Sequence, residues 1–282
     1  MIAHIAAALV ASIGMTQQMD TTFAVSGSGQ LDLNNHEGTV VVSTWDREEI
    51  RIQAEWDDGP RPITIRQAGS TVRVRVRGDM GLPAVDFDLT VPRGMSIAVQ
   101  GISVGVSIDG SQANIAVQSV EGDVAVIGGS GNVAIQAVEG DVEVHEASGH
   151  IAVHSIEGHV IVRESDGTVE VEAVDGDVDL IDIDSENIGV NVVDGDVTFQ
   201  GAIHDGGRYF MSTHDGDLNI IIPDDSNARV SIATYDGELE SDIPIEIEGD
   251  ISKRRFSFTL GTGQALVELS SFDGVIRLQK AP

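Results

Sequence analysis

The feature that most constrains the fold is a series of glycines at a fixed interval of nine residues. Seven glycines keep this spacing without a break, within phrases such as Glu-Gly-Asp-Val. Self-similarity at a fixed period is the mark of a repeat architecture, in which each unit buries its apolar face against its neighbours. The glycines are Gly122, Gly131, Gly140, Gly149, Gly158, Gly167 and Gly176.

Within this nine-residue unit, two positions are consistently aliphatic. In a frame that starts at Met95, the third position is always valine or isoleucine, as at Val124, Val133 and Val142, and the fifth is also aliphatic, as at Val126 and Ile135. Apolar residues two apart define one face of a short strand. The unit therefore predicts one short strand followed by a corner, where glycine suits positive φ and close backbone approach.

The eighth position of the unit alternates between large and small residues, for example Val120, Gly129, Val138 and Ala147. The physical repeat is therefore two units, about 18 residues, with two strands and two corners. We predict an all-β fold: a single-stranded parallel β-solenoid of about 18 residues per coil, in two nine-residue halves. Ile183 breaks this alternation, and we expect longer coils beyond it.

The sequence predicts four regions. Residues 1–18 are expected to be a signal peptide, 19–94 an N-terminal β region or cap, 95–242 the β-solenoid repeats, and 243–282 C-terminal strands and a cap. Six strands are expected between residues 31 and 91 and three between 254 and 278, with Phe256 and Phe258 as plugs. Solenoids need such ends because an open last coil would pair with another molecule.

An apolar segment from Ile2 to Ile13 is too short to span a bilayer but has the length of a signal-peptide core. We therefore expect an exported protein of the periplasm, the cell surface or the extracellular space. No second apolar run has the length of a membrane span, so the protein is not expected to be transmembrane.

The formal net charge is −30, and only three basic residues, Arg163, Arg208 and Arg229, lie between Met95 and Ile251. Such a surface repels phosphate backbones, so nucleic acid is not expected as a partner. The chain has no cysteine, which excludes disulfides and thiolate metal sites.

Several segments resemble the bacterial β-strand repeat proteins of the DUF4097 family, whose members carry the label adhesin. The resemblance implies an exported, envelope-associated parallel β-solenoid without established catalytic residues, and an envelope protein or a surface glycan as partner. The resembling segments are Phe23-Ala24-Val25, Leu31-Asp32-Leu33, Gly38-Thr39-Val40, Trp45-Asp46, residues 89–94, the serial Gly-Asp-Val turns, Gly261-Thr262-Gly263 and residues 272–276.

Acidic residues flank the corner glycines and should form a ladder along one edge of the stack. Divalent cations such as Ca²⁺ could bridge its rungs through hard oxygen ligands; the alternative is a solvated edge screened by salt. The three-glycine loop of the calcium-binding nonapeptides of secreted toxins is absent. The candidate ligands are Glu121, Asp123, Glu139, Asp141, Asp175, Asp177, Asp194 and Asp196.

Three functions remain open at this point. The first is a non-catalytic, exported envelope or surface protein, an adhesin or interaction platform. The second is a self-assembling scaffold that polymerises like a bactofilin, and the third is a polysaccharide-active β-helix enzyme. No serine-nucleophile, phosphate-binding or zinc-protease motif occurs, so we expect no catalytic residues and no cofactor.

Overall fold

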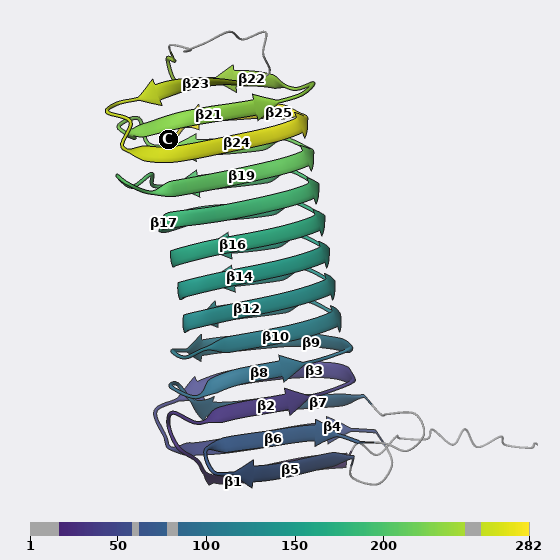
Figure 1. Ribbon diagram of the computed structural model, residues 1–282. Coiled ribbons are helices and arrows are strands. Elements are labelled where there is room, and N and C mark those ends of the chain that lie inside the picture. Colours follow the sequence, from purple (N-terminus) through teal and green to yellow (C-terminus); the bar gives the residue numbers. More distant parts are fainter. Residues whose placement is uncertain (1–16, 58–61, 78–83, 246–254, 282) are drawn as a thin grey trace, which may run out of the picture.

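The computed structural model describes residues 17–57, 62–77, 84–245 and 255–281. Every secondary-structure element assigned within these ranges is a strand, and the strands are numbered β1 to β25. The prediction of an all-β fold is therefore confirmed. The strands stack into one tall column (Figure 1). Residues 1–16 of the expected signal peptide lie outside the described residues, whereas Gln17 and Gln18 begin β1 (Gln17–Ala24).

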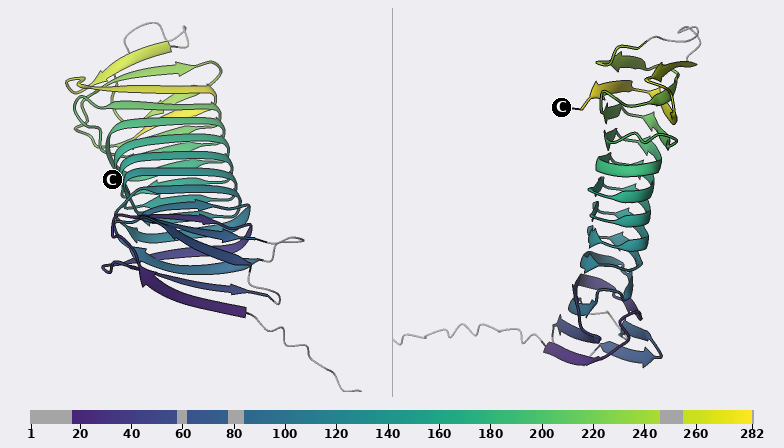
Figure 2. Two further views of the ribbon diagram at one scale, coloured as in Figure 1. Left: turned by 60° about the horizontal axis from the view of Figure 1, so that its bottom comes forward. Right: turned by 90° about the vertical axis from the view of Figure 1, so that its left-hand side faces the viewer.

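The middle of the column is a stack of flattened coils with one strand on each side (Figure 2). Partner strands run parallel: Val133 lies opposite Ile151 and Val142 opposite Val160, so that paired residues are 18 apart in sequence. We call the two sides the β12 side and the β13 side. The β12 side contains β8 (Ser96–Gln100), β10 (Ile115–Glu121), β12 (Ser130–Glu139), β14 (Ser148–Glu157) and β16 (Asp166–Asp175). The β13 side contains β9 (Ser103–Ser111), β11 (Val124–Gly128), β13 (Val142–His145) and β15 (Val160–Arg163), and β17 (Val178–Asp194) crosses from it to the β12 side.

The core is the thin layer between the two sides. Val124 and Val126 point into it from the β13 side and Val133 and Ile135 from the β12 side, each at most 1% exposed. Burying such a side chain contributes about 1.5–3 kcal/mol. Because strand pairing keeps each aliphatic residue opposite the next one along the stack, the core is one continuous apolar column.

The two corners of a coil differ, and this difference explains the eighth-position alternation. On the β13 side a residue with positive φ, such as Gly128, Glu146 or Glu164, precedes the eighth position. The left-handed residue turns the next side chain inward, so that only a small residue such as Ala147 normally fits there. Ile183 follows Asp182, whose φ is also positive, and is buried in the same way. Its size departs from the pattern but its orientation does not.

The corner before the β13-side strands brings glycines of successive coils into close contact. A Cβ atom on Gly140, whose φ is +125°, would lie 2.7 Å from the carbonyl oxygen of Gly122. No real Cβ contact is that short, so a side chain at Gly140 would push adjacent coils apart.

The chain interleaves its coils at both ends of the column. The first coil lies between two later ones, because β2 pairs in parallel with β6 and β8, and β3 with β7 and β9. Likewise β24 lies between β19 and β21, and β25 between β20 and β22. The strands are β2 (Gln30–Asn34), β3 (Glu37–Trp45), β6 (Thr71–Val76), β7 (Val85–Pro92), β18 (Val197–Gly201), β19 (Arg208–Asp215), β20 (Leu218–Ile222), β21 (Ala228–Thr234), β22 (Glu238–Ser241), β24 (Ala265–Asp273) and β25 (Val275–Lys280).

Antiparallel strands lie on the outermost coils at both ends, although among the described residues β22 pairs only with β25 and carries no such strand. At the N-terminal end β4 (Glu49–Trp56) pairs with β7, β1 with β4, and β5 (Ile63–Ala68) with β6. At the other end β23 (Arg255–Leu260) lies antiparallel on β21 and buries Phe256 and Phe258, as the sequence predicted. The sequence predicted region boundaries at residues 94 and 242. In the structure the stack of coils continues across both positions, because β2–β3 and β24–β25 are layers of the same column.

Candidate interaction surface

Large aliphatic side chains form an exposed column along one edge of the β12 side. All but one belong to the end of a strand, directly before a corner, where the strand alternation turns the side chain outward; Ile102 lies in the corner between β8 and β9. Each is between 40% and 50% exposed, although nothing in the packing of the core requires an apolar residue there. A contiguous exposed apolar patch of this kind marks an interaction site in soluble proteins. This aliphatic column consists of Ile102, Val120, Val138, Ile156, Val174 and Val193.

Aromatic rings continue the column toward the C-terminal end of the stack. Val193 is followed in register by His214, Phe272 and Tyr235. The rings of His214 and Phe272 stack with centroids 4.7 Å apart, and those of Phe272 and Tyr235 do the same. Since the rings cover each other's faces, the column presents ring edges to the solvent.

A groove of about 700 Å³ runs beside the aliphatic column. Its other wall is a row of polar side chains two residues earlier in each strand. Gln100 Nε2 donates to Gln118 Oε1 and Gln118 Nε2 donates to Gln136 Oε1, and His154 Nδ1 lies 3.0 Å from Glu172 Oε2. Every wall residue except Asn191 is therefore held by a side-chain contact along the stack, which leaves a preformed groove that is apolar on one side and polar on the other.

A row of carboxylates borders the aliphatic column at the corner. These pre-glycine carboxylates follow the aliphatic residues directly in sequence, lie opposite one another in successive coils and are exposed. At the coil spacing of about 4.8 Å, neighbouring charges repel by roughly 1 kcal/mol in water and about 3.5 at the effective dielectric of a protein surface. The pre-glycine carboxylates are Glu121, Glu139, Glu157, Asp175 and Asp194.

The aspartates that follow the glycines have a different role. Asp123 Oδ1 accepts a 3.0 Å hydrogen bond from the backbone N–H of Asp141, and Asp141 Oδ1 accepts one from His159. Asp177 and Asp196 repeat this contact with the N–H groups of the next coil. These post-glycine aspartates therefore satisfy backbone donors at the corner and connect adjacent coils.

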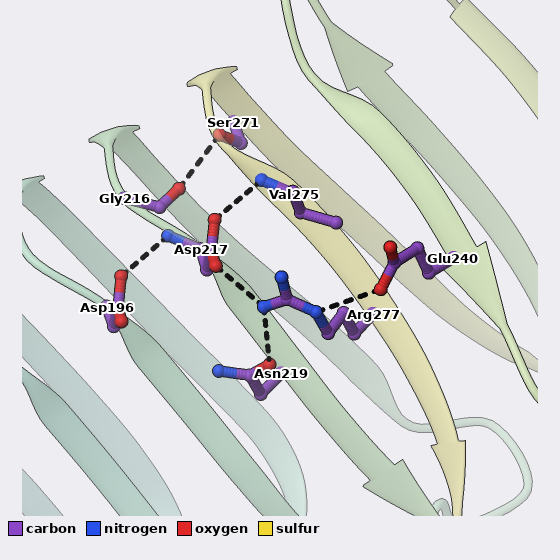
Figure 3. A network of polar contacts seen from close by, with 8 residues as sticks. All are labelled: Asp196, Gly216, Asp217, Asn219, Glu240, Ser271, Val275 and Arg277. Atoms are coloured by element: carbon purple, nitrogen blue, oxygen red, sulfur yellow. Dashed lines mark hydrogen bonds and ion pairs between the residues drawn. The ribbon is translucent and has the colours of Figure 1, made fainter.

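The row of post-glycine aspartates ends at an arginine (Figure 3). Asp217 Oδ1 accepts from the N–H of Val275, and its Oδ2 lies 2.6 Å from Arg277 Nη1. The Val275 N–H and the Arg277 guanidinium hold the pKa of the Asp217 carboxyl below its usual value, against the opposing effect of partial burial. Arg277 also contacts Glu240, so one cation neutralises two carboxylates at this end of the stack.

The structure thus separates the predicted cation ligands into two rows. Glu121, Glu139, Asp175 and Asp194 belong to the pre-glycine row, and Asp123, Asp141, Asp177 and Asp196 to the post-glycine row. Within the described ranges no group of three or more His, Asp or Glu side chains is arranged to hold a metal ion. Bridging by Ca²⁺ and a solvated edge screened by salt therefore both stay hypotheses, and half of the proposed ligands already accept a hydrogen bond from a backbone N–H group.

The sequence contained the signal for the aliphatic column, but periodicity alone did not reveal its exposure. The large eighth-position residues indicated the length of the coil. Whether they face the core or the solvent depends on the φ angle of the preceding residue. On the β12 side that residue, for example Ala137, continues the strand and faces inward, which places Val138 outside.

A family model described as Toastrack DUF4097 matches residues 28–279. A solved structure from Parabacteroides distasonis, described as "putative lipid binding protein", shares 8% identity and a TM-score of 0.51, with 94% of this chain and 98% of that chain covered. A structure described as "putative adhesin" from Bacteroides fragilis has 11% identity and a TM-score of 0.44, with coverages of 93% and 96%. No curated protein matches the chain. The part of the chain that the structure describes contains no helix able to cross a bilayer.

Proposed function

This chain belongs to the Toastrack DUF4097 family, and on that basis we propose that it is a non-catalytic interaction protein of the cell envelope or cell surface. Its binding face is the aliphatic column together with the adjoining groove. The stack of 18-residue coils is a parallel β-solenoid that serves as the rigid support for this face. Export through the apolar segment from Ile2 to Ile13 is part of the proposal.

The observation that carries the proposal is the repeated exposure of valine and isoleucine at one position of every central coil. A fold that only needed solubility would place polar residues there, as it does at the neighbouring Gln118 and Gln136. Exposed apolar residues scattered singly need no explanation, but a row next to a preformed groove favours a partner.

Two features support an interaction role over the alternatives. The antiparallel strands β1 and β5 at one end and β23 at the other oppose head-to-tail continuation of parallel coils, which a filament requires. In the groove, the carboxylate of Glu172 faces His154 and has no second carboxylate beside it among the groove residues. A glycosidase uses a pair of carboxylates.

The test combines localisation with a surface variant. Cells that produce the full chain are fractionated and the N-terminus of the mature protein is sequenced; we expect it in the envelope or the medium. Purified protein is then immobilised and its capture of envelope protein and surface glycan fractions is measured. Ile156→Lys should abolish capture, whereas Ile127→Lys, at a residue of similar exposure on the β13 side, should not. Cytoplasmic location, or equal capture by both variants, would contradict the proposal.

A further inference from the structure

We infer that the groove binds a basic amphipathic α-helix, with the apolar face of the helix on the aliphatic column and its Lys or Arg side chains on the pre-glycine carboxylates. This inference rests on the proposed function and specifies the chemistry of the partner. It follows from three properties of the surface: the hydrogen bonding of its backbone, its charge and its length.

The backbone of the β12 side requires a partner that satisfies its own hydrogen bonds. Each central strand already pairs on both edges, as β14 does with β12 and β16. A strand laid across this face would therefore leave its N–H and C=O groups facing valines and isoleucines without partners, which is unfavourable. A helix has all its central backbone groups paired internally and can lie on such a surface.

The charge of the surface requires a cationic partner. The post-glycine aspartates are occupied by backbone N–H groups, but within the described residues no ion pair involves Glu139, Glu157, Asp175 or Asp194. These carboxylates repel one another along the stack and border the aliphatic column directly. Lys or Arg side chains at the edge of the apolar face of a helix would reach them and relieve that repulsion.

The length of the surface fits a helix of ordinary size. The aliphatic column runs from Ile102 to Val193 over six coils, which at the usual strand spacing is about 24 Å. At 1.5 Å per residue, a helix of about 16 residues covers that distance. The apolar stripe of such a helix contacts the column while its flank lies in the groove beside the glutamine row.

A second copy of this chain fits the surface less well. Two aliphatic columns brought together would also bring two rows of carboxylates together, on a protein of net charge −30. The same charge repels anionic lipid headgroups.

The probe is a synthetic peptide of about 18 residues, with leucine at helical spacing on one face and lysine on the other. Binding to the full chain is followed by fluorescence anisotropy, and helix formation by circular dichroism. We expect saturable binding coupled to helix formation. A scrambled peptide of the same composition should bind at least tenfold more weakly. Equal binding of the scrambled peptide would show non-specific charge attraction and overturn the inference.

Surface variants identify the contacts. Val138→Ser with Ile156→Ser should weaken binding of the leucine–lysine peptide about tenfold. Glu139→Gln with Glu157→Gln should weaken peptide binding to a similar extent and should also make the binding affinity less dependent on salt concentration. The matched control, Glu143→Gln with Glu146→Gln, removes the same charge from the β13 side and should leave binding unchanged. Equal loss in this control would overturn the assignment to the groove.

A neutral peptide of leucine and glutamine separates failure of the inference from failure of the proposed function. If it binds as tightly as the lysine peptide and Val138→Ser with Ile156→Ser weakens both, the groove is an interaction face but does not select basic helices. If neither peptide binds and the wild type self-associates through these residues in sedimentation, the occupant is a second copy. If neither peptide binds and the wild type remains monomeric, this face does not bind helices of either charge.

Discussion

Asp141 Oδ1 accepts a 2.9 Å hydrogen bond from the backbone N–H of His159, one coil further along the stack. The same contact joins Asp123 to Asp141 and Asp177 to Asp196. The carboxylate directly after Gly122, Gly140 or Gly176 is thus a structural element of the solenoid, and its stabilising contribution can be separated from that of the carboxylate directly before the glycine.

Replacing Asp141 by alanine should lower the free energy of unfolding by about 0.5–1 kcal/mol, since one hydrogen bond at an exposed corner is lost. Asp141→Asn keeps an acceptor oxygen and should recover most of this loss. Glu139→Ala, in the pre-glycine row, is the control and should be neutral or slightly stabilising because it removes charge repulsion. Urea denaturation followed by circular dichroism measures all three, and a larger loss in Glu139→Ala than in Asp141→Ala would contradict the assignment of roles.

Gly140→Ala should destabilise the stack by at least about 2 kcal/mol, because the residue has positive φ and its Cβ would meet the backbone of Gly122. Gly105→Ala is the control, since a Cβ there meets no atom within 4 Å. Thermal unfolding of both variants measures the difference. Equal melting temperatures would show that adjacent coils can separate at this corner without cost.

The contact between Asp217 and Arg277 should contribute to stability in a pH-dependent way. The pKa of Asp217 is lowered in the folded state, mainly by the Val275 N–H and further by Arg277. The folded state therefore binds a proton less readily than the unfolded chain, and the stabilisation is present at neutral pH and is lost as the pH falls below about 4. The melting temperature of the wild type should be higher than that of Asp217→Asn at pH 6, and the difference between the two melting temperatures should become smaller toward pH 3. A constant difference across this range would contradict the pKa shift.

Calcium should stabilise the protein no more than sodium does at equal ionic strength. The post-glycine aspartates already accept backbone hydrogen bonds, which leaves single carboxylates on each coil of the pre-glycine row, and screening by salt relieves their repulsion. Melting curves in CaCl₂ and NaCl of matched ionic strength test this expectation. A rise specific to calcium that disappears in Glu139→Gln would instead establish a bridging cation.

The full chain should form short single particles and no filaments. The antiparallel strands at the two ends do not offer the parallel register that a continuing coil needs. Electron microscopy and sedimentation at increasing protein concentration test this expectation. Filaments with the coil spacing along their axis would restore the scaffold hypothesis.

The strands and the core could be predicted from the sequence, because aliphatic residues two apart in every nine-residue unit are compatible with few backbone arrangements. Val124 and Val126 had to share a face, and the stacking of identical positions followed from the repeat. The strands expected between residues 31 and 91, and between 254 and 278, are also present.

The parts that the sequence did not predict depend on single backbone angles and on long-range order. The outward orientation of Val138 and the inward orientation of Ala147 differ because of the positive φ at Glu146, an acidic residue in a position where glycine is the usual signal. The interleaving of β24 and β25 reverses the rule that consecutive elements are neighbours, and no local pattern marks it.

This interleaving has a consequence for how the molecule is made. During synthesis β21 and β22 leave the ribosome before β24 and β25, yet they rest on those later strands and not on β19 and β20. β21 can pair with β23 as soon as that strand is made, but β21 and β22 cannot reach their place on the stack until β24 and β25 have been translated. The middle of the column can form by adding one coil after another in the order of synthesis. The C-terminal end is complete only when β24 and β25 have taken their place between β19–β20 and β21–β22.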